Sequence, residues 1–300
     1  MYIGLIGDLH GHVFETLAAI AIWQNRIGRQ FDLLIQAGDL GAYPDLAKLD
    51  PDSVRHMAAD PAIGDFSRFL TIRGRQKEAL HTLRNQFKSP IYFLRGNHED
   101  FDWLKQLSLH TEPDGGINAM QGTAQVDPFN FYRYVPDNTV LQFVDNNGQS
   151  LAIGFLGGVE ELTGPPAFDP EAYVAMLARK SGSIDILIAH EGPYGSSIGY
   201  HGDTHGSQMI TRLIEHLKPP FLVAGHAHCL SGPAMYDETL YLGLNIIRSS
   251  ALWYPEATGL QPGWIGILDT DASTLEPVTD AWLTEFDTPF SFDEWWAKFR

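Results

Sequence analysis

The segment Gly96-Asn97-His98-Glu99 places an amide, an imidazole and a carboxylate side by side. It follows residues 90–94, a short apolar run that predicts a strand ending just before Gly96. The side-chain oxygen of an Asn is a neutral, weak metal ligand, so an Asn beside a His points to a cation site that stronger ligands complete. We therefore expect carboxylates and imidazoles from elsewhere in the chain to meet Asn97.

Four further polar blocks occur where an apolar, strand-like run gives way to glycine or another small residue. They are Asp8-Leu9-His10, Gly38-Asp39, Ala189-His190 and Gly225-His226-Ala227-His228. In open α/β sheets, functional side chains gather beyond the carboxyl ends of the strands. The five blocks are therefore expected to converge at the strand ends.

In this order, the five blocks resemble the calcineurin-like metallophosphoesterases, whose pattern runs Asp-x-His, Gly-Asp, Gly-Asn-His-Asp/Glu, His and Gly-His-x-His. The resemblance covers residues 3–228. One such dipeptide would carry no information, whereas the complete ordered set is a strong signal. The resemblance implies an α/β fold, a four-layer αββα sandwich of two mixed β-sheets flanked by helices.

The resemblance also implies two divalent or trivalent metal ions and assigns their ligands. One ion would be held by Asp8, His10, Asp39 and His228, and the other by Asp39, Asn97, His190 and His226. Asp39 would bridge the ions, because two close dications repel each other and need an anion between them. Manganese, iron and zinc suit these ligands about equally.

The implied reaction is metal-dependent hydrolysis of a phosphodiester or phosphomonoester by a metal-bridging hydroxide, with His98 as the general acid. An imidazole suits proton transfer near neutral pH. Weaker expectations concern the substrate, for which Arg95, His201 and His205 are candidate contacts.

Several alternatives stay open within and beyond this chemistry. Residues 94–99 also resemble the Ser/Thr protein phosphatases, but those enzymes follow the bridging Asp with Val-Asp-Arg-Gly, where this chain has Ala42 and Tyr43. Their Asp, which orients the catalytic His, and their Arg, which grips phosphate, thus lack counterparts in the motif. RNA lariat debranching enzymes are similar around residues 8–17 and 31–34, although they carry Cys at the position of Asp8. The same fold also serves as a non-catalytic scaffold, because fold does not fix function.

Length and composition favour one folded domain. With 44% hydrophobic residues, the 300-residue chain can support a substantial core. We expect a single domain over residues 1–300, with a loop-rich insertion at 41–65 and an irregular segment at 110–138.

The net charge of −17 disfavours nucleic acid as a substrate without excluding it, since bound metals restore positive charge locally. A small phosphate ester is the expected partner. The one cysteine, Cys229, precludes an internal disulfide and is expected to be a buried apolar residue rather than a ligand. Without a leader pattern or a long apolar run, the sequence predicts a cytoplasmic protein that does not enter the membrane.

Apolar periodicity predicts the elements that carry these blocks. Helices are expected at residues 13–27, 66–87 with a break near Gly74, 101–107, 170–179, 208–217 and 290–299. Strands are expected at 2–6, 31–35, 90–94, 184–188, 221–224, 240–248 and 264–268, and as a hairpin at 139–144 and 151–156.

Overall fold

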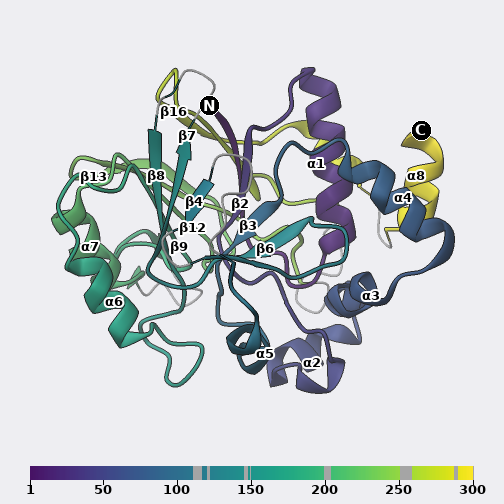
Figure 1. The fold of residues 1–300 in the computed structure, drawn as a ribbon, viewed down its shortest axis with the longest axis horizontal. Coiled ribbons are helices and arrows are strands. Elements are labelled where there is room, and N and C mark those ends of the chain that lie inside the picture. Colours follow the sequence, from purple (N-terminus) through teal and green to yellow (C-terminus); the bar gives the residue numbers. More distant parts are fainter. Residues whose placement is uncertain are drawn as a thin grey trace.

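A computed structural model describes the chain except for residues 111–116, 120–121, 145–147, 149, 199–203, 251–258, 287–289 and 300. Two seven-stranded β-sheets pack together, with helices on their outer faces (Figure 1). Both sheets contain parallel and antiparallel pairs. The predicted αββα sandwich of two mixed sheets is confirmed.

The first sheet is built around the N-terminal strand. Its order is β16 (Thr274–Pro277), β15 (Ile265–Asp269), β1 (Tyr2–Ile6), β2 (Leu33–Gln36), β3 (Ile91–Phe93), β6 (Tyr132–Tyr134) and β5 (Ala124–Gln125). Strands β1, β2, β3 and β6 are neighbours and run parallel, with Ile3 opposite Leu33 and Leu34 opposite Ile91. Their carboxyl ends therefore share one edge of the sheet.

The second sheet holds most of the later strands. Its order is β13 (Ser231–Tyr236), β14 (Thr239–Gly243), β12 (Phe221–Ala224), β9 (Ile186–Ala189), β8 (Ser150–Leu156), β7 (Thr139–Val144) and β4 (Ile117–Ala119). The hairpin predicted at 139–156 is present as β7 and β8. A separate small hairpin pairs β10 (Ser197–Ile198) with β11 (Thr204–His205).

Helices cover the outer faces and extend beyond the strand ends. Those on the first sheet are α1 (Val13–Ile27), α3 (Asp65–Thr71), α4 (Gly74–Arg84) and α8 (Phe292–Phe299), and those on the second are α6 (Pro170–Leu177) and α7 (Gln208–Leu217). Further short helices are η1 (Leu46–Lys48), α2 (Pro51–Met57), η2 (Pro61–Gly64), α5 (Phe101–Gln106) and η3 (Ala281–Glu285). Among the described residues, no helix combines the length and apolar character needed to cross a membrane.

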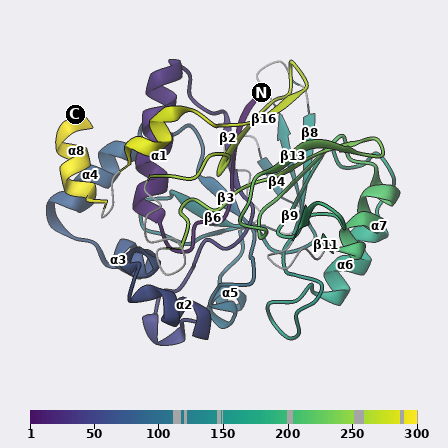
Figure 2. The same ribbon diagram turned by 180° about the vertical axis from the view of Figure 1, so that it is seen from behind.

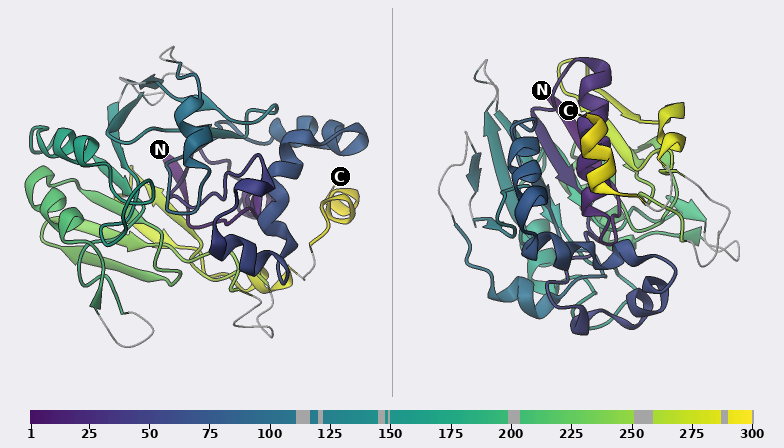
Figure 3. Two further views of the ribbon diagram at one scale, coloured as in Figure 1. Left: turned by 90° about the horizontal axis from the view of Figure 1, so that it is seen from below. Right: turned by 90° about the vertical axis from the view of Figure 1, so that its right-hand side faces the viewer.

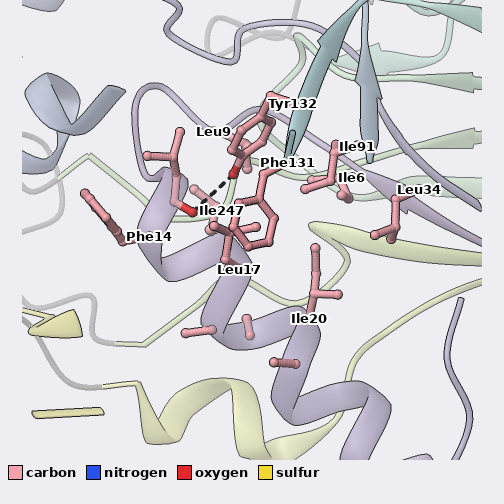
Figure 4. Close-up of a cluster of buried hydrophobic side chains, with 14 of the residues drawn as sticks. Ile6, Leu9, Phe14, Leu17, Ile20, Leu34, Ile91, Phe131, Tyr132 and Ile247 are labelled. Atoms are coloured by element: carbon pink, nitrogen blue, oxygen red, sulfur yellow. Dashed lines mark hydrogen bonds between the residues drawn. The ribbon is translucent and has the colours of Figure 1, made fainter. Parts of the chain in front are cut away.

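Burial of apolar side chains fixes the layers. Leu17 and Ile20 of α1 face Ile6, Leu34 and Ile91 of three neighbouring strands, and all five are at most 1% exposed (Figure 4). Each such side chain contributes roughly 1.5–3 kcal/mol of burial free energy. The hydroxyl of Tyr132 donates to the carbonyl of Val13 at 3.1 Å, which ties β6 to the start of α1.

The aromatic segment near the C-terminus forms the predicted docking helix. Phe292 and Trp296 of α8 are buried against the α1 side of the first sheet, and the Phe292 ring lies 5.4 Å from that of Phe14. Figure 2 and the right panel of Figure 3 show α8 beside α1 in two perpendicular views. Residues more than 270 positions apart in sequence are thus packed in one layer.

Several element predictions need correction. The described part of residues 110–138 is not irregular throughout, because it contains β4, β5 and β6. The strand predicted at 240–248 ends at Gly243, and β13 and β16 were not predicted. The break near Gly74 separates two helices, α3 and α4. In the structure, residues 41–65 contain loops and the short helices η1, α2 and η2.

Candidate metal centre

The five polar blocks follow strand ends in both sheets. Asp8, Asp39 and Asn97 come after β1, β2 and β3 of the first sheet. His190 directly follows β9, and His226 and His228 follow β12 of the second. The left panel of Figure 3 looks onto this end of the sheets. The sandwich therefore brings carboxylates and imidazoles from both sheets to one place, as the sequence predicts.

One group consists of Asp8, His10, Asp39 and His228, whose potential ligand atoms all lie within 4.8 Å of one another. The Nε2 atom of His228 is 3.1 Å from Asp8 Oδ2 and 3.0 Å from His10 Nε2. Two imidazole nitrogens and a carboxylate oxygen thus point at a common centre. Such a donor set suits a first-row transition metal.

A second group consists of Asp39, His190 and His226 and meets the same distance criterion. Asn97 joins it, because its Oδ1 lies 2.9 Å from His190 Nε2. Asp39 belongs to both groups. The structure therefore places the eight residues singled out by the sequence, His98 included, around one shared carboxylate.

The two carboxylate oxygens of Asp39 have different surroundings. Oδ1 accepts hydrogen bonds from the backbone N–H groups of Asn97 and His98, each at 2.7 Å. Oδ2 is buried and accepts no hydrogen bond from any described residue, although His190 Nε2 and His10 Nε2 lie 3.4 and 3.7 Å away. A buried oxygen without a partner costs about 1–3 kcal/mol. A bound cation would remove this cost, so the residues present fit a metal site.

His190 is held in the orientation that a ligand needs. Its Nδ1 donates to the carbonyl of Ala37 at 2.8 Å, which directs Nε2 toward Asn97 and Asp39. Burial lowers the pKa of His190, but the carboxylates of Asp39 and Asp8 outweigh it and raise the pKa to about 9. A proton and a metal ion would therefore compete for Nε2.

The backbone of the centre is strained. His10, Asp39, His226 and His228 have φ angles of 42°, 55°, 66° and 50°, in the left-handed region. Each such residue costs of order 1 kcal/mol, and strain of this kind gathers at functional sites. Position 96 also requires glycine, because a Cβ there would collide with the Asp39 carboxylate.

His98 lies beside the candidate ligands and is oriented by a residue from the insertion. Its ring is 5.1 Å from that of His10, and its Nδ1 lies 3.0 Å from Asp50 Oδ2. The same Asp50 oxygen accepts hydrogen bonds from Tyr43 Oη at 2.7 Å and Ser53 Oγ at 2.6 Å. Asp50 also caps the N-terminus of α2.

The Asp50 contact perturbs both groups. Burial lowers the pKa of His98, but Asp39 and the hydrogen bond to Asp50 raise it to about 9. Burial raises the pKa of Asp50, but the hydrogen bonds with His98 and Ser53 outweigh it, so the pKa is lowered. The contact thus favours the protonated form of His98 and the ionised form of Asp50.

Asp50 is the functional candidate that the sequence reasoning missed. The motif comparison left the catalytic His without an orienting Asp, whereas the structure supplies one from 48 residues upstream. An Asp followed by Pro51 does indicate a helix start, but nothing in the sequence indicates which side chain the carboxylate faces.

Of the three predicted substrate contacts, the structure describes Arg95 and His205. The Arg95 guanidinium donates to Asp137 at 2.7 Å and to the carbonyls of Pro165 and Ala167 at 2.7 and 2.9 Å. It therefore holds together the loops that contain these residues. His205 is exposed on β11, and His201 lies outside the described residues. Cys229 is exposed, which corrects the expectation of a buried thiol.

Comparison with known proteins supports the assignment of the fold. The family model for calcineurin-like phosphoesterases matches residues 1–230. No curated protein sequence matches the chain. One crystal structure superposes with a TM-score of 0.50 at 10% identity, covering 93% of this chain and 98% of the other.

Two proteins of Thermus thermophilus are also similar. TT1561 gives a TM-score of 0.44 at 12% identity, covering 93% of this chain and 98% of the other. A hypothetical protein gives 0.43 at 13% identity, covering 92% and 98%.

Proposed function

This chain belongs to the calcineurin-like phosphoesterase family, and we propose that it hydrolyses a small phosphoester with the help of two metal ions held by the seven candidate ligands. Membership of the family implies metal-dependent phosphoester hydrolysis. The observation that carries the two-ion proposal is Asp39, which belongs to both ligand groups and has a buried oxygen that no described residue satisfies.

The geometry supports a ligand role for each of the seven residues. Asp8, His10 and His228 would hold one ion together with Asp39. Asn97, His190 and His226 would complete the other. Bound metal ions would supply positive charge to the phosphoryl group and make a water molecule acidic enough to attack near neutral pH.

His98 is the proposed general acid. Its raised pKa favours the protonated imidazole, and it belongs to neither ligand group. Its Nδ1 is occupied by Asp50, so its Nε2 is the nitrogen that can give a proton to a departing oxygen. Asp50 is a positioning residue, because it acts on the leaving group only through His98.

The centre favours a broad phosphodiesterase or phosphatase role over the alternatives. A scaffold has no use for a complete ligand set with strained backbone at four ligand positions. The Arg that grips phosphate in Ser/Thr protein phosphatases has no counterpart, because Arg95 is committed to Asp137 and two carbonyls. The choice among manganese, iron and zinc follows from availability.

The proposal is tested by assaying the purified protein with manganese, zinc or iron on bis(p-nitrophenyl) phosphate and p-nitrophenyl phosphate. We expect turnover of at least one ester, and Asp39→Asn should lower kcat/KM by more than the roughly 10–100-fold lost with a supporting hydrogen bond. Asp52→Asn, on the exposed side of α2, is the matched control. Turnover that Asp39→Asn leaves intact would refute the proposed centre, and no turnover with any metal would refute the enzymatic role.

A further inference from the structure

Gln36, the last residue of β2, is a fully buried amide in an otherwise apolar strand. Its side chain is 0% exposed, although glutamine lies mostly on protein surfaces. A buried amide without hydrogen bonds would destabilise the fold, so groups of this kind have partners. The partners of Gln36 are backbone groups of two loops that carry candidate metal ligands.

The side-chain oxygen of Gln36 holds the peptide group between Ala37 and Gly38. Oε1 accepts a hydrogen bond from the N–H of Gly38 at 3.2 Å. The carbonyl of the same peptide group accepts the hydrogen bond from Nδ1 of His190, at 2.8 Å. A peptide group is planar, and in the trans form its N–H and C=O point in opposite directions. Gln36 therefore fixes, from one side, the peptide group that orients His190 on the other.

Close packing leaves this peptide group little room to turn. Gly38 has a φ angle of 97°, and a Cβ there would lie 2.4 Å from Nδ1 of His190 and 3.1 Å from Cα of Gly96. The backbone at Gly38 thus runs directly between the His190 ring and the residue before Asn97. In so tightly packed a place, a change on the Gln36 side is transmitted to the imidazole.

The side-chain nitrogen of Gln36 connects the loops that follow β1 and β2. Nε2 donates to the carbonyl of Gly7 at 3.1 Å and to the carbonyl of Gly38. These carbonyls belong to the peptide groups that lead into Asp8 and Asp39. The orientation of the amide follows from its partners, because a carbonyl can only accept and a backbone N–H can only donate. One side chain therefore supports the backbone beside both candidate carboxylate ligands.

We propose that Gln36 is a positioning residue of the metal centre, which fixes Asp8 and Asp39 through their backbone and His190 through the carbonyl of Ala37. This role rests on the proposed function for the task of the centre, and it adds a residue outside the seven candidate ligands on which their geometry depends. Loss of a supporting hydrogen bond behind a metal ligand typically weakens metal binding about 10- to 100-fold.

Two equivalent substitutions separate positioning from stability. Gln36→Met keeps the length of the side chain and removes both halves of the amide. Gln24→Met is the matched control, because Gln24 is also buried, donates to the carbonyl of Gln86 at 3.0 Å and accepts from the N–H of Phe31 at 2.9 Å. These partners precede β3 and β2, so they lie at the opposite end of the strands from the centre. Both variants should lower the melting temperature by similar amounts.

Manganese is titrated into the metal-free form of each protein by calorimetry. Gln36→Met should bind manganese at least about tenfold more weakly than the wild type, and Gln24→Met should stay within about twofold of it. Unchanged binding by Gln36→Met, or equal weakening in both variants, would overturn the positioning role.

A second measurement needs no metal and follows the Nδ1–H group of His190 directly. Its NMR signal is recorded in metal-free protein with isotope-labelled histidine and is identified by its absence in His190→Gln. Exchange of this proton with water should be at least about tenfold faster in Gln36→Met than in the wild type and in Gln24→Met. Equal exchange in all three proteins would contradict the link from Gln36 to His190.

The conservative variant Gln36→Glu tests rescue and replaces Gln36→Met if that protein does not fold. Its side chain keeps an acceptor for the N–H of Gly38 but, even when protonated, can donate to only one of the two carbonyls. Exchange of the His190 proton should therefore stay within about twofold of the wild type, while manganese binding weakens at least about threefold. Manganese binding equal to that of the wild type would overturn the proposal.

The two measurements distinguish failure of this role from failure of the proposed function. A wild-type protein that binds no manganese would refute the proposed function, and the exchange of the His190 proton would then decide the role of Gln36 alone. Manganese binding that no substitution of Gln36 changes would leave the proposed function standing and remove Gln36 from the centre.

Discussion

The carboxylate of Asp50 makes several contacts with different structural roles. It accepts hydrogen bonds from Tyr43 and Ser53, contacts His98 and caps α2. Asn caps helices about as well as Asp but carries no charge. The substitution Asp50→Asn therefore separates the charge facing His98 from the support of the helix.

For Asp50→Asn we expect kcat to fall about 10- to 100-fold for an ester with a poor leaving group and much less for a p-nitrophenyl ester, because only the poor leaving group needs the proton of His98. The melting temperature should stay close to that of the wild type. Equal slowing of both esters would contradict the positioning role. The control is Asp52→Asn in the same helical turn, where the carboxylate is 63% exposed.

Asp65 gives a pH dependence that is independent of the metal centre. Burial raises its pKa to about 6 from an ordinary 3.8, despite the nearby Arg68. The folded protein thus holds this proton more tightly than the unfolded chain does. The resulting stabilisation is complete below about pH 3.8 and is lost as the pH rises through about 6.

Asp65→Asn should therefore be more stable than the wild type at pH 8, by up to about 3 kcal/mol, with the difference shrinking toward pH 4. Loss of the 3.3 Å contact with Arg68 will reduce the gain. Urea unfolding at pH 8 and at pH 4 measures the difference in unfolding free energy between the variant and the wild type. A variant that is less stable than the wild type at pH 8 would show that the ion pair outweighs the cost of burial.

At the scale of elements, the insertion is fastened to α1 by a buried ionic cluster. His12 bonds through Nδ1 to Glu15 and through Nε2 to Asp60, both at 2.8 Å. Burial lowers the pKa of His12, but the two carboxylates raise it to about 10, so it is a cation at neutral pH. Arg248 completes the cluster by bonding to Glu15 at 2.7 Å.

Replacing His12 with Gln should destabilise the protein by about 3 kcal/mol, because it leaves a buried carboxylate with less compensation. Hydrogen exchange should quicken in α2 and η2 before it does in the sheets. Asp60→Asn, which keeps a cap on η2, should cost less. If exchange in α2 and η2 is unchanged in His12→Gln, the cluster does not hold the insertion.

The elements were predictable where apolar periodicity was long. The 15 residues of α1 and the six- and seven-residue strands β7 and β8 gave clear patterns. By contrast, β6 has three residues and follows Pro128 and Asn130, which suggest turns. Its place beside β3 depends on parallel pairing with a strand about 40 residues away. The local sequence does not indicate which distant strand it will pair with.

The centre was predictable because its residues follow strand ends in a fixed order. Asp50 was not, since its contact with His98 depends on how the insertion folds back over β3 and the loop after it. The cluster around His12 likewise joins residues 12, 15, 60 and 248, which share no periodic pattern. Long-range polar contacts of this kind become visible only when the tertiary packing is known.

At the scale of the whole molecule, the centre joins the two sheets. Asp8, Asp39 and Asn97 follow strands of the first sheet, whereas His190, His226 and His228 follow strands of the second. Ions bound between them would crosslink the sandwich. Because the unfolded chain cannot assemble the same ligands, metal binding adds directly to folding stability.

Manganese at 100 times its dissociation constant should stabilise the protein by about 2.7 kcal/mol. Thermal melting with manganese chloride and with EDTA measures the difference without any substrate. In Asp39→Asn the difference should largely disappear. Equal melting of the wild type under both conditions would show that the candidate ligands bind no manganese.

The position of β1 between β2 and β15 has a consequence for biosynthesis. During translation, β1 emerges long before β15, so one of its two edges can pair only after residues 265–269 have left the ribosome. A nascent chain would thus expose an unpaired strand edge until β15 is made, and unpaired edges promote aggregation. Chaperone dependence during expression, and insolubility of products that stop before residue 265, would follow from this late closure.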